Sequence, residues 1–103
     1  MKVYRDYKGQ SIRLTEERRK HILEHPEMKS LMPRIEETLS EPQRVIQSLS
    51  DKDANLYYKY YLGTMVGDKY LCVVVKMMKK DAFILTAYLT DTIKKGEILW
   101  LRK

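Results

Sequence analysis

The chain has 103 residues, of which 44% are hydrophobic and 33% are charged, and its net charge is +6. This length suits one hydrophobic core, so we expect a single domain over residues 1–103. The ordinary apolar fraction excludes global disorder, and the longest apolar run, residues 71–75, is far shorter than the roughly 20 residues of a membrane-spanning helix. The N-terminus lacks the apolar stretch of a secretory signal, and Cys72 is the single cysteine. We therefore expect a cytoplasmic protein without a membrane partner.

The segment before Pro42 favours helices. Residues 11–14 alternate between polar and apolar and predict a short strand. Thr15 then suits the N-cap of a helix that ends near His25, because a following proline disfavours helical geometry. A second helix follows, with Pro33 tolerated in its first turn and apolar side chains every three or four residues, at Met28, Leu31 or Met32, Ile35 and Leu39.

The segment after Pro42 favours strands. Alternation predicts four of them, joined by connections of hairpin length, at residues 44–50, 56–62, 69–76 and 82–90. Residues 94–100 predict a turn and a last apolar segment that folds back. Helices followed by strands indicate an α+β domain, in which we expect the two N-terminal helices to pack on one face of a four-stranded antiparallel sheet.

The last two predicted strands have one apolar side each. Side chains alternate along a strand. The apolar side of the strand at residues 69–76 therefore carries Leu71, Val73 and Val75, and the apolar side of the strand at residues 82–90 carries Phe83, Leu85, Ala87 and Leu89. We expect these two sets to lie under the helices. The opposite sides are mixed and polar, and they are where we expect the chemistry.

The positive charge is concentrated in the second half of the chain. Residues 1–55 have a net charge of +1, whereas residues 56–103 carry 9 Lys and Arg against 4 Asp and Glu. The second half also holds six of the eight tyrosines. Cations interleaved with aromatic rings suit the binding of RNA, by phosphate neutralisation and base stacking. A solvated basic face beside tyrosines packed on a sheet is the alternative.

His21 and His25 are the only histidines, and their spacing places them on one helix face together with Arg18. A guanidinium beside two imidazoles can hold a phosphate and supply acid and base groups near neutral pH. Surface histidines beside a packed arginine are the alternative. The segment also matches H-x-x-E-H, an inverted zinc-protease signature, but Pro26 ends the helix at once. The carboxylates after Pro42 are scattered over turns and strand ends, so we predict no metal site and no cofactor.

Lys76, Thr86 and Tyr88 share one predicted sheet face on adjacent strands. An ammonium can neutralise a phosphate, while two hydroxyls can bond its oxygens without a metal. Lys59 joins this set only if its strand faces the same way, which the surrounding run of tyrosines leaves open. The alternative is that Lys76 simply ends a strand and Thr86 is an ordinary β-branched strand residue.

Four motifs occur in order along the chain: Arg18-x-x-His21-Ile22-x-x-His25-Pro26-Glu27, Pro42, Tyr57-Tyr58-Lys59, and Leu85-Thr86-Ala87-Tyr88-Leu89-Thr90-Asp91. This pattern, over residues 11–101, resembles small bacterial and phage-borne domains of the barnase/EndoU/colicin/RelE superfamily of metal-independent ribonucleases. The resemblance implies a RelE/barnase-like fold. It also implies active-site candidates at His25, His21, Lys59, Lys76, Thr86 and Tyr88.

The activity implied by the resemblance is cleavage of RNA by 2′-hydroxyl transesterification. His25 would be the base or acid with His21 as its partner, cations would stabilise the phosphorane, and hydroxyls would orient the phosphate. The cations are Lys76, Lys59 and Arg18, the hydroxyls are Thr86 and Tyr88, and Tyr58 would contact the RNA. Such a protein suits the toxin of a toxin–antitoxin or competition system, with a small cognate antitoxin as partner. A non-catalytic RNA-binding module and a protein-interaction module remain the alternatives.

Overall fold

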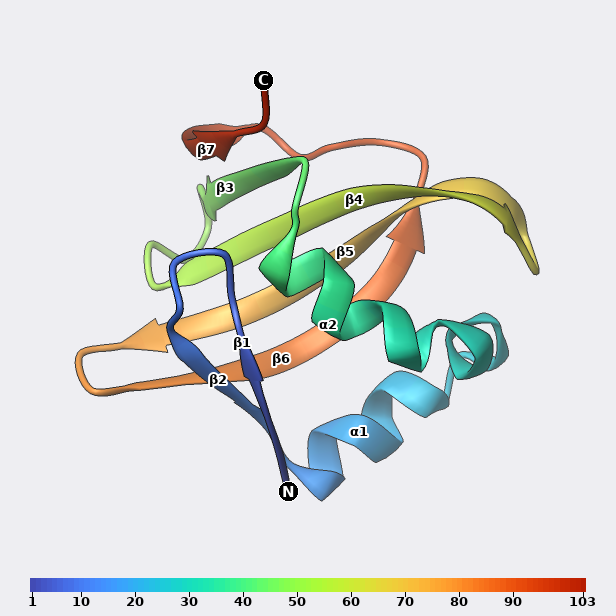
Figure 1. Ribbon diagram of the computed structural model, residues 1–103, viewed down its shortest axis with the longest axis horizontal. Helices are drawn as coiled ribbons and strands as arrows, with labels where there is room; N and C mark the ends of the chain where they lie inside the picture. Colours follow the sequence, from blue (N-terminus) through green and yellow to red (C-terminus); the bar gives the residue numbers. More distant parts are fainter.

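A seven-stranded mixed sheet forms the centre of the molecule in the computed structural model, which describes residues 1–103 (Figure 1). The strands stand in the order β1-β2-β6-β5-β4-β3-β7. All neighbours are antiparallel except β2 and β6, which are parallel. Their bounds are β1 Lys2–Arg5, β2 Ser11–Leu14, β3 Arg44–Ser48, β4 Ala54–Thr64, β5 Gly67–Met78, β6 Asp81–Thr90 and β7 Gly96–Leu101.

The expected fold, with two N-terminal helices on a four-stranded antiparallel sheet, is therefore wrong, because the sheet is mixed with seven strands and two of those strands precede the helices. The four central strands β3 to β6 lie where they were predicted, but β1 and β2 extend the sheet beyond β6, and β7 extends it beyond β3. Both extensions depend on partners far away in the sequence. Arg13 of β2 bonds the Asp81 carboxylate at 2.8 Å, and the buried Asp6 accepts a 2.8 Å hydrogen bond from the Tyr57 hydroxyl. Local alternation carries no information about such partners.

Two α-helices and a 3₁₀ helix connect β2 to β3. Helix α1 (Glu16–Leu23) begins where the Thr15 hydroxyl accepts a 3.2 Å hydrogen bond from the Arg18 N–H. The second predicted helix is divided into a 3₁₀ helix, η1 (Pro26–Leu31), and helix α2 (Met32–Ser40), with Pro33 in the first turn of α2. None of the helices is long and apolar enough to span a bilayer.

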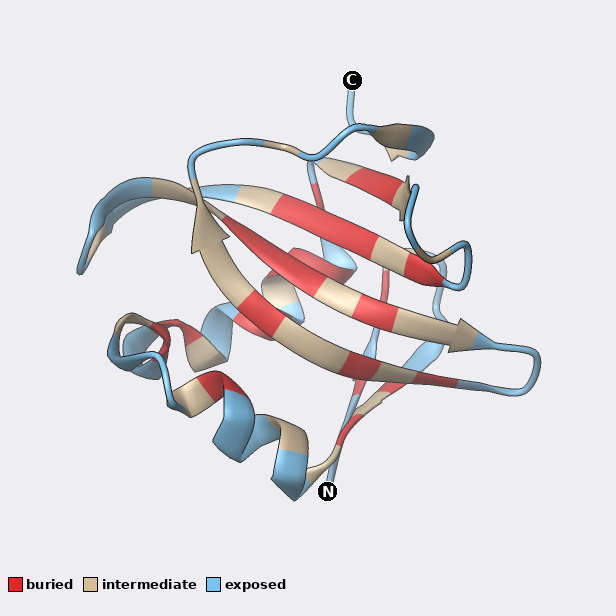
Figure 2. Ribbon diagram, turned by 180° about the vertical axis from the view of Figure 1, so that it is seen from behind, coloured by how far each residue is buried: buried red, intermediate tan, exposed pale blue.

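The helices cover one face of the sheet. Ile22, Met28, Ile35 and Leu39 are fully buried there, in one core cluster with Leu71, Val73 and Val75 of β5. The other face carries a smaller cluster of Ile46, Leu56, Tyr58 and Cys72. Figure 2 shows this second face, where no helix crosses β4, β5 or β6. We call it the open face.

A bulge in β6 changes which of its side chains point to the helices. The pairing passes from Val74 with Thr86 to Val75 with Ile84, so Leu85 has no partner. Ala82 and Ile84 therefore join Ala87 in the helix-side core. The expectation that Phe83 and Leu85 lie under the helices is wrong, because one extra residue inverts the facing of the preceding strand segment.

Candidate nucleic-acid interface

The open face carries three of the predicted site residues. Lys76 lies on β5, and Thr86 and Tyr88 lie on β6, where Thr86 pairs with Val74 and Tyr88 pairs with Cys72. Alternate residues of β5 from Cys72 to Lys76 point to the same side, so all three belong to this face. Tyr58 of β4 pairs with Cys72 and lies on it too.

Lys76 stands at one end of this face in an ion pair. Its Nζ lies 2.6 Å from Oδ2 of Asp51, in the β3–β4 connection. The hydrogen bond and charge of Asp51 raise the pKa of Lys76, and Lys76 in turn lowers the pKa of Asp51. Four residues along a strand separate Lys76 from Cys72, which is about 13 Å. The ammonium is thus neutralised by its neighbour and stands apart from Tyr88.

Tyr88 lies near the middle of the face with its hydroxyl buried and without a hydrogen-bond partner. Burial raises the pKa of Tyr88, and the neighbouring Cys72 adds to the rise. Burial also raises the pKa of Tyr58 to about 12 and that of Cys72 to about 11. All three groups keep their protons near neutral pH, so they can donate hydrogen bonds but cannot act as bases.

The crossover between β6 and β7 covers part of the same face. The Lys94 N–H donates a 3.1 Å hydrogen bond to the Tyr58 hydroxyl, and the Lys94 Nζ lies 5.9 Å from the centre of the Tyr88 ring. Ile93 packs against the small cluster of the open face. The crossover thus adds a cation above the Tyr88 ring.

The histidines lie outside the open face. His21 is in α1 and His25 is the N-cap of η1, and both are exposed. Each imidazole Nδ1 has a carboxylate nearby, Glu24 at 3.8 Å and Glu27 at 3.5 Å respectively. The half-buried Arg18 is in the same helix α1.

Helix α1 runs beside β6 in both views (Figures 1 and 2). The only register partners between β2 and β6 are Arg13 and Phe83, so the later part of β6 has no neighbouring strand on that side. His21 and His25 thus lie in, or just after, a helix that packs beside the strand that holds Thr86 and Tyr88. They do not contact those hydroxyls.

Lys59 lies on the helix side. It pairs with Leu71, and its Nζ is 3.8 Å from a carboxylate oxygen of both Glu37 and Glu41. Its side chain is only 16% exposed. The tyrosine run is divided accordingly, with Tyr58 and Tyr60 on the open face. The structure therefore does not bring Lys59 together with Lys76.

Sequence reasoning missed a pocket at the other end of the open face, with a volume of about 350 Å³. It forms because β7 returns to pair with β3, which places Arg44 opposite Leu101. No local pattern signals this pairing. The lining residues are Gln43, Arg44, Tyr58, Tyr70, Ile93, Leu101, Arg102 and Lys103.

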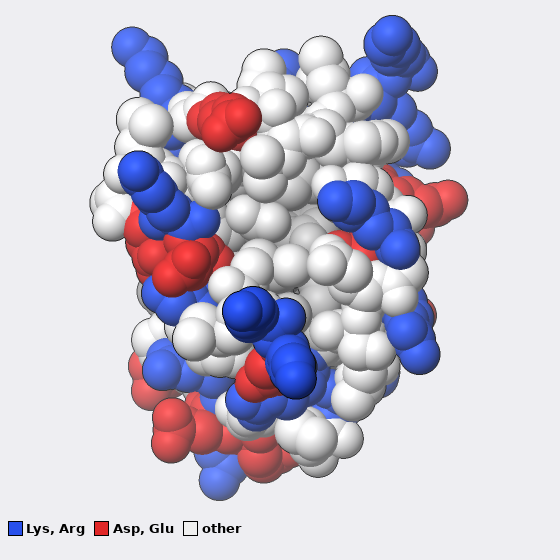
Figure 3. All heavy atoms as spheres, turned by 90° about the vertical axis from the view of Figure 1, so that its left-hand side faces the viewer, with Lys and Arg blue, Asp and Glu red and all other residues white.

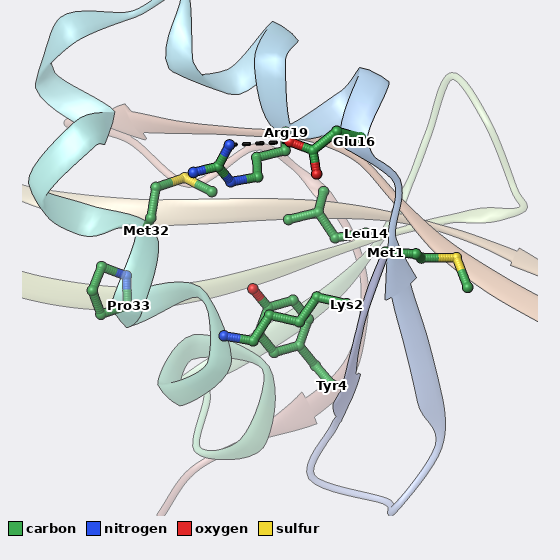
Figure 4. A pocket seen from close by; sticks show the side chains of 8 residues that line it. All are labelled: Met1, Lys2, Tyr4, Leu14, Glu16, Arg19, Met32 and Pro33. Atoms are coloured by element: carbon green, nitrogen blue, oxygen red, sulfur yellow. Dashed lines mark hydrogen bonds and ion pairs between the residues drawn. The ribbon is translucent and has the colours of Figure 1, made fainter.

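A second pocket lies on the helix side between β1 and the helices, and it has a volume of about 520 Å³ (Figure 4). Glu16 and Arg19 form an ion pair of 3.2 Å in its wall, and Lys2 and the buried Tyr4 contribute its other polar groups. None of the predicted site residues lines it.

The distribution of charge and of metal-ligand side chains adds two findings. At the end of the molecule that carries the β5–β6 turn, Lys and Arg stand apart with Asp and Glu among them, so this end has no continuous basic patch (Figure 3). No three His, Cys, Asp or Glu side chains are placed together so that they could hold a metal ion.

Comparison with known proteins gives one match. None of the curated proteins and none of the solved structures matches this chain. A family model described as phage-Barnase-EndoU-ColicinE5/D-RelE like nuclease2 matches residues 1–102, which is nearly the whole chain. The resemblance to the barnase/EndoU/colicin/RelE superfamily is confirmed by this match. The protein belongs to the phage-Barnase-EndoU-ColicinE5/D-RelE like nuclease2 family.

Proposed function

We propose that this member of a nuclease family is a metal-independent endoribonuclease that binds RNA on the open face. The observation that carries the proposal is the Tyr88 hydroxyl, which is buried without a hydrogen-bond partner. An unsatisfied buried donor costs on the order of 1–3 kcal/mol, and a phosphate oxygen of the RNA would satisfy it if the β6–β7 crossover, which places Lys94 over the Tyr88 ring, moves aside. Thr86 offers a second hydroxyl on the same face.

The proposed reaction is transesterification. The ribose 2′-oxygen attacks the adjacent phosphorus, and a base takes its proton. The bond from phosphorus to the 5′-oxygen breaks, and an acid protonates the leaving oxygen. The products are a 2′,3′-cyclic phosphate and a 5′-hydroxyl end, and cations stabilise the charge that develops on the phosphorane.

We assign the proton transfers to His25 and His21, whose side chains are exposed and which lie in, or just after, α1, the helix that packs beside the edge of β6. An RNA backbone that crosses this edge would meet the imidazoles on one side and the hydroxyls of Thr86 and Tyr88 on the other. Arg18 of α1 would contribute a cation beside the imidazoles. Lys76 would bind the phosphate only if its ion pair with Asp51 breaks. Lys59 would not bind the phosphate, because it remains paired with Glu37 and Glu41.

We further propose a biological role as the toxin of a toxin–antitoxin or competition system. The membership of a nuclease family and the net charge of +6 support it, since an acidic antitoxin would suit a basic toxin. Expression in bacteria should then arrest growth. The His25→Ala variant and co-expression of the cognate antitoxin should each relieve the arrest.

The experiment that tests the activity is incubation of the purified protein with end-labelled RNA in EDTA. Cleavage should persist, and the fragments should carry 2′,3′-cyclic phosphate and 5′-hydroxyl ends. A matched oligonucleotide with 2′-O-methyl groups should stay intact because its nucleophile is blocked. Loss of cleavage in EDTA, or cleavage of the blocked strand, would contradict the proposed reaction. Binding without cleavage by folded protein would favour a non-catalytic RNA-binding module.

A further inference from the structure

The pocket between β3, β7 and the β6–β7 crossover has the size of a small-ligand site. Its volume of about 350 Å³ falls at the lower end of the range of about 300–1,000 Å³ that such sites occupy. Tyr58 and Tyr70 form part of its wall, and Ile93 and Leu101 give it an apolar component. Its dimensions suit a single nucleotide unit rather than a folded partner.

The cations of this pocket are free of carboxylates. Arg44, Arg102 and Lys103 form no ion pair with any acidic residue, and no Asp or Glu lines the pocket. Lys76 and Lys59, which the sequence favoured as phosphate ligands, are both paired with carboxylates. An unpaired guanidinium binds a phosphate in a bidentate manner without first losing a partner. The pocket is therefore better suited to an anion than either lysine.

The aromatic side of the pocket is held in place by specific contacts. The Tyr70 ring lies edge-to-face with Tyr58 at 6.2 Å and with Tyr60 at 4.8 Å between ring centres. Tyr58 is fully buried, and the Gln43 N–H donates to its carbonyl at 2.8 Å. The Arg102 N–H donates to the Gln43 carbonyl at 3.0 Å. These bonds fix the backbone at the end of β7 beside the tyrosines, so the cations and the rings line one pocket.

We propose that this pocket is the subsite for one nucleotide of the RNA strand, with Arg44 and Arg102 on its phosphate and the Tyr70 ring against its base. The inference rests on the proposed function and adds to it a site at which one base of the RNA is recognised. Tyr70 is two residues along β5 from Cys72, the partner of Tyr88, which is a separation of about 7 Å. The subsite thus adjoins the hydroxyl assigned to the phosphate, and it would set the cleavage position relative to the bound base.

The test measures binding of a fluorescent 2′-O-methyl RNA oligonucleotide, which the protein cannot cleave, by anisotropy over a series of salt concentrations. Arg44→Gln and Arg102→Gln should each weaken binding, and the double variant should reduce the slope of log K against log salt by about 0.7, the value for one single-strand phosphate. Tyr70→Leu should weaken binding on the order of tenfold, because it removes a stacking surface. Lys80→Gln, in the exposed β5–β6 turn, is the matched control and should bind like the wild type.

A second oligonucleotide, without bases, separates stacking from charge. The two arginine variants should bind it more weakly than the wild type does, whereas Tyr70→Leu should bind it as the wild type does. If circular dichroism shows that Tyr70→Leu does not fold, the test is the comparison of RNA binding by the two arginine variants with binding by the Lys80→Gln control. A free 5′-mononucleotide should compete with the oligonucleotide only where Arg44 and Arg102 are intact.

Cleavage by the same preparations distinguishes the two proposals. Cleavage by the wild type together with unchanged binding in all three pocket variants would overturn the subsite and leave the ribonuclease proposal standing. Pocket-dependent binding without any cleavage would support the subsite and contradict the ribonuclease. An equal loss in Lys80→Gln and Arg44→Gln would overturn the subsite, because it would indicate diffuse attraction to a basic protein.

Discussion

The Lys76 ammonium lies 2.6 Å from the Asp51 carboxylate, across 25 residues of sequence. This pair occupies one end of the open face, and the unpaired arginines of the nucleotide pocket occupy the other. Because Asp51 has its pKa lowered by Lys76, it keeps its charge as the pH falls below the usual value near 4. Both partners therefore carry their charges at physiological pH, and Lys76 can bind a phosphate only by leaving Asp51.

Asp51→Asn should strengthen RNA binding, since it removes the negative charge that competes with phosphate for Lys76. The slope of log K against log salt should steepen by about 0.7 if the released ammonium contacts one phosphate. Anisotropy titrations measure both quantities. Glu36→Gln is the control, because Glu36 is exposed on α2, away from the open face, and forms no ion pair. Unchanged binding in Asp51→Asn would exclude Lys76 from the interface.

Tyr57→Phe should destabilise the fold by about 1–3 kcal/mol, because it removes one of the hydrogen bonds to the buried Asp6 carboxylate. Asp6 also accepts bonds from the Lys8 and Gln10 N–H groups, so the β1–β2 turn is anchored to β4 through this residue. Urea unfolding measures the change. Tyr60→Phe, with a more exposed ring, should unfold like the wild type. Equal stability of the two variants would contradict the role given to the Asp6–Tyr57 bond.

The same residue predicts how stability depends on alkaline pH. Burial, followed by the hydrogen bond to Asp6, raises the pKa of Tyr57 above its usual value near 10. The folded state then holds a proton that the unfolded state releases, so its stabilising contribution is complete below pH 10 and is lost as the pH rises further. Tyr57→Phe should show a shallower loss of stability between about pH 10 and 12 in urea unfolding series. Parallel pH curves would show that Tyr57 does not contribute.

Tyr88→Phe should separate catalysis from folding. The hydroxyl has no partner in the protein, so its removal should leave the free energy of unfolding unchanged or slightly raised. Cleavage should fall, on the order of tenfold or more, if the hydroxyl donates to the phosphate in the transition state. Stopped assays on labelled RNA and urea unfolding measure the two effects. If Tyr88→Phe lowers the free energy of unfolding but keeps full activity, the Tyr88 hydroxyl stabilises the fold and does not act in cleavage.

His25→Ala should lower the cleavage rate by about 10²–10⁴-fold while RNA binding persists, since a positioned acid or base contributes on this order. The wild-type rate should follow a bell-shaped pH profile if the reaction needs one imidazole as base and the other as acid. The exposed His25 side chain makes a folding defect in the variant unexpected. Full activity of the double variant would transfer the chemistry to the lysines and tyrosines of the sheet.

Gly96→Ala should loosen β7 from β3. A Cβ at this position would collide with the Gln47 carbonyl oxygen and lie 2.5 Å from Cγ2 of Ile46. Overpacking of this kind costs about 1–3 kcal/mol. Hydrogen exchange should show faster exchange of β7 amides, and binding in the nucleotide pocket should weaken, because Arg102 follows β7. Leu99→Ala, an exposed β7 residue, is the control. Unchanged exchange in Gly96→Ala would contradict the close approach of the two strands.

The sequence alone was sufficient where the signal is local. Thr15 and Pro26 bracket α1, and Pro42 precedes the first strand of the central sheet, because capping and proline geometry depend on near neighbours. The four central strands followed from alternation, and the motifs around His21 and Tyr88 were enough to identify the superfamily.

The tertiary structure alone decided what depends on distant partners. The edges of the central sheet accept β2 and β7 through pairings between distant parts of the chain, and β1 joins through its hairpin with β2, which is why the sheet has seven strands rather than four. A single bulge at Leu85 reversed the facing of the side chains in the first part of β6, because one inserted residue shifts the alternation of sides along a strand. Charge pairing across the fold neutralised Lys76 and Lys59 and left Arg44 and Arg102 free. The availability of a cation is set by which carboxylate folding brings beside it, and no spacing within the sequence contains that information.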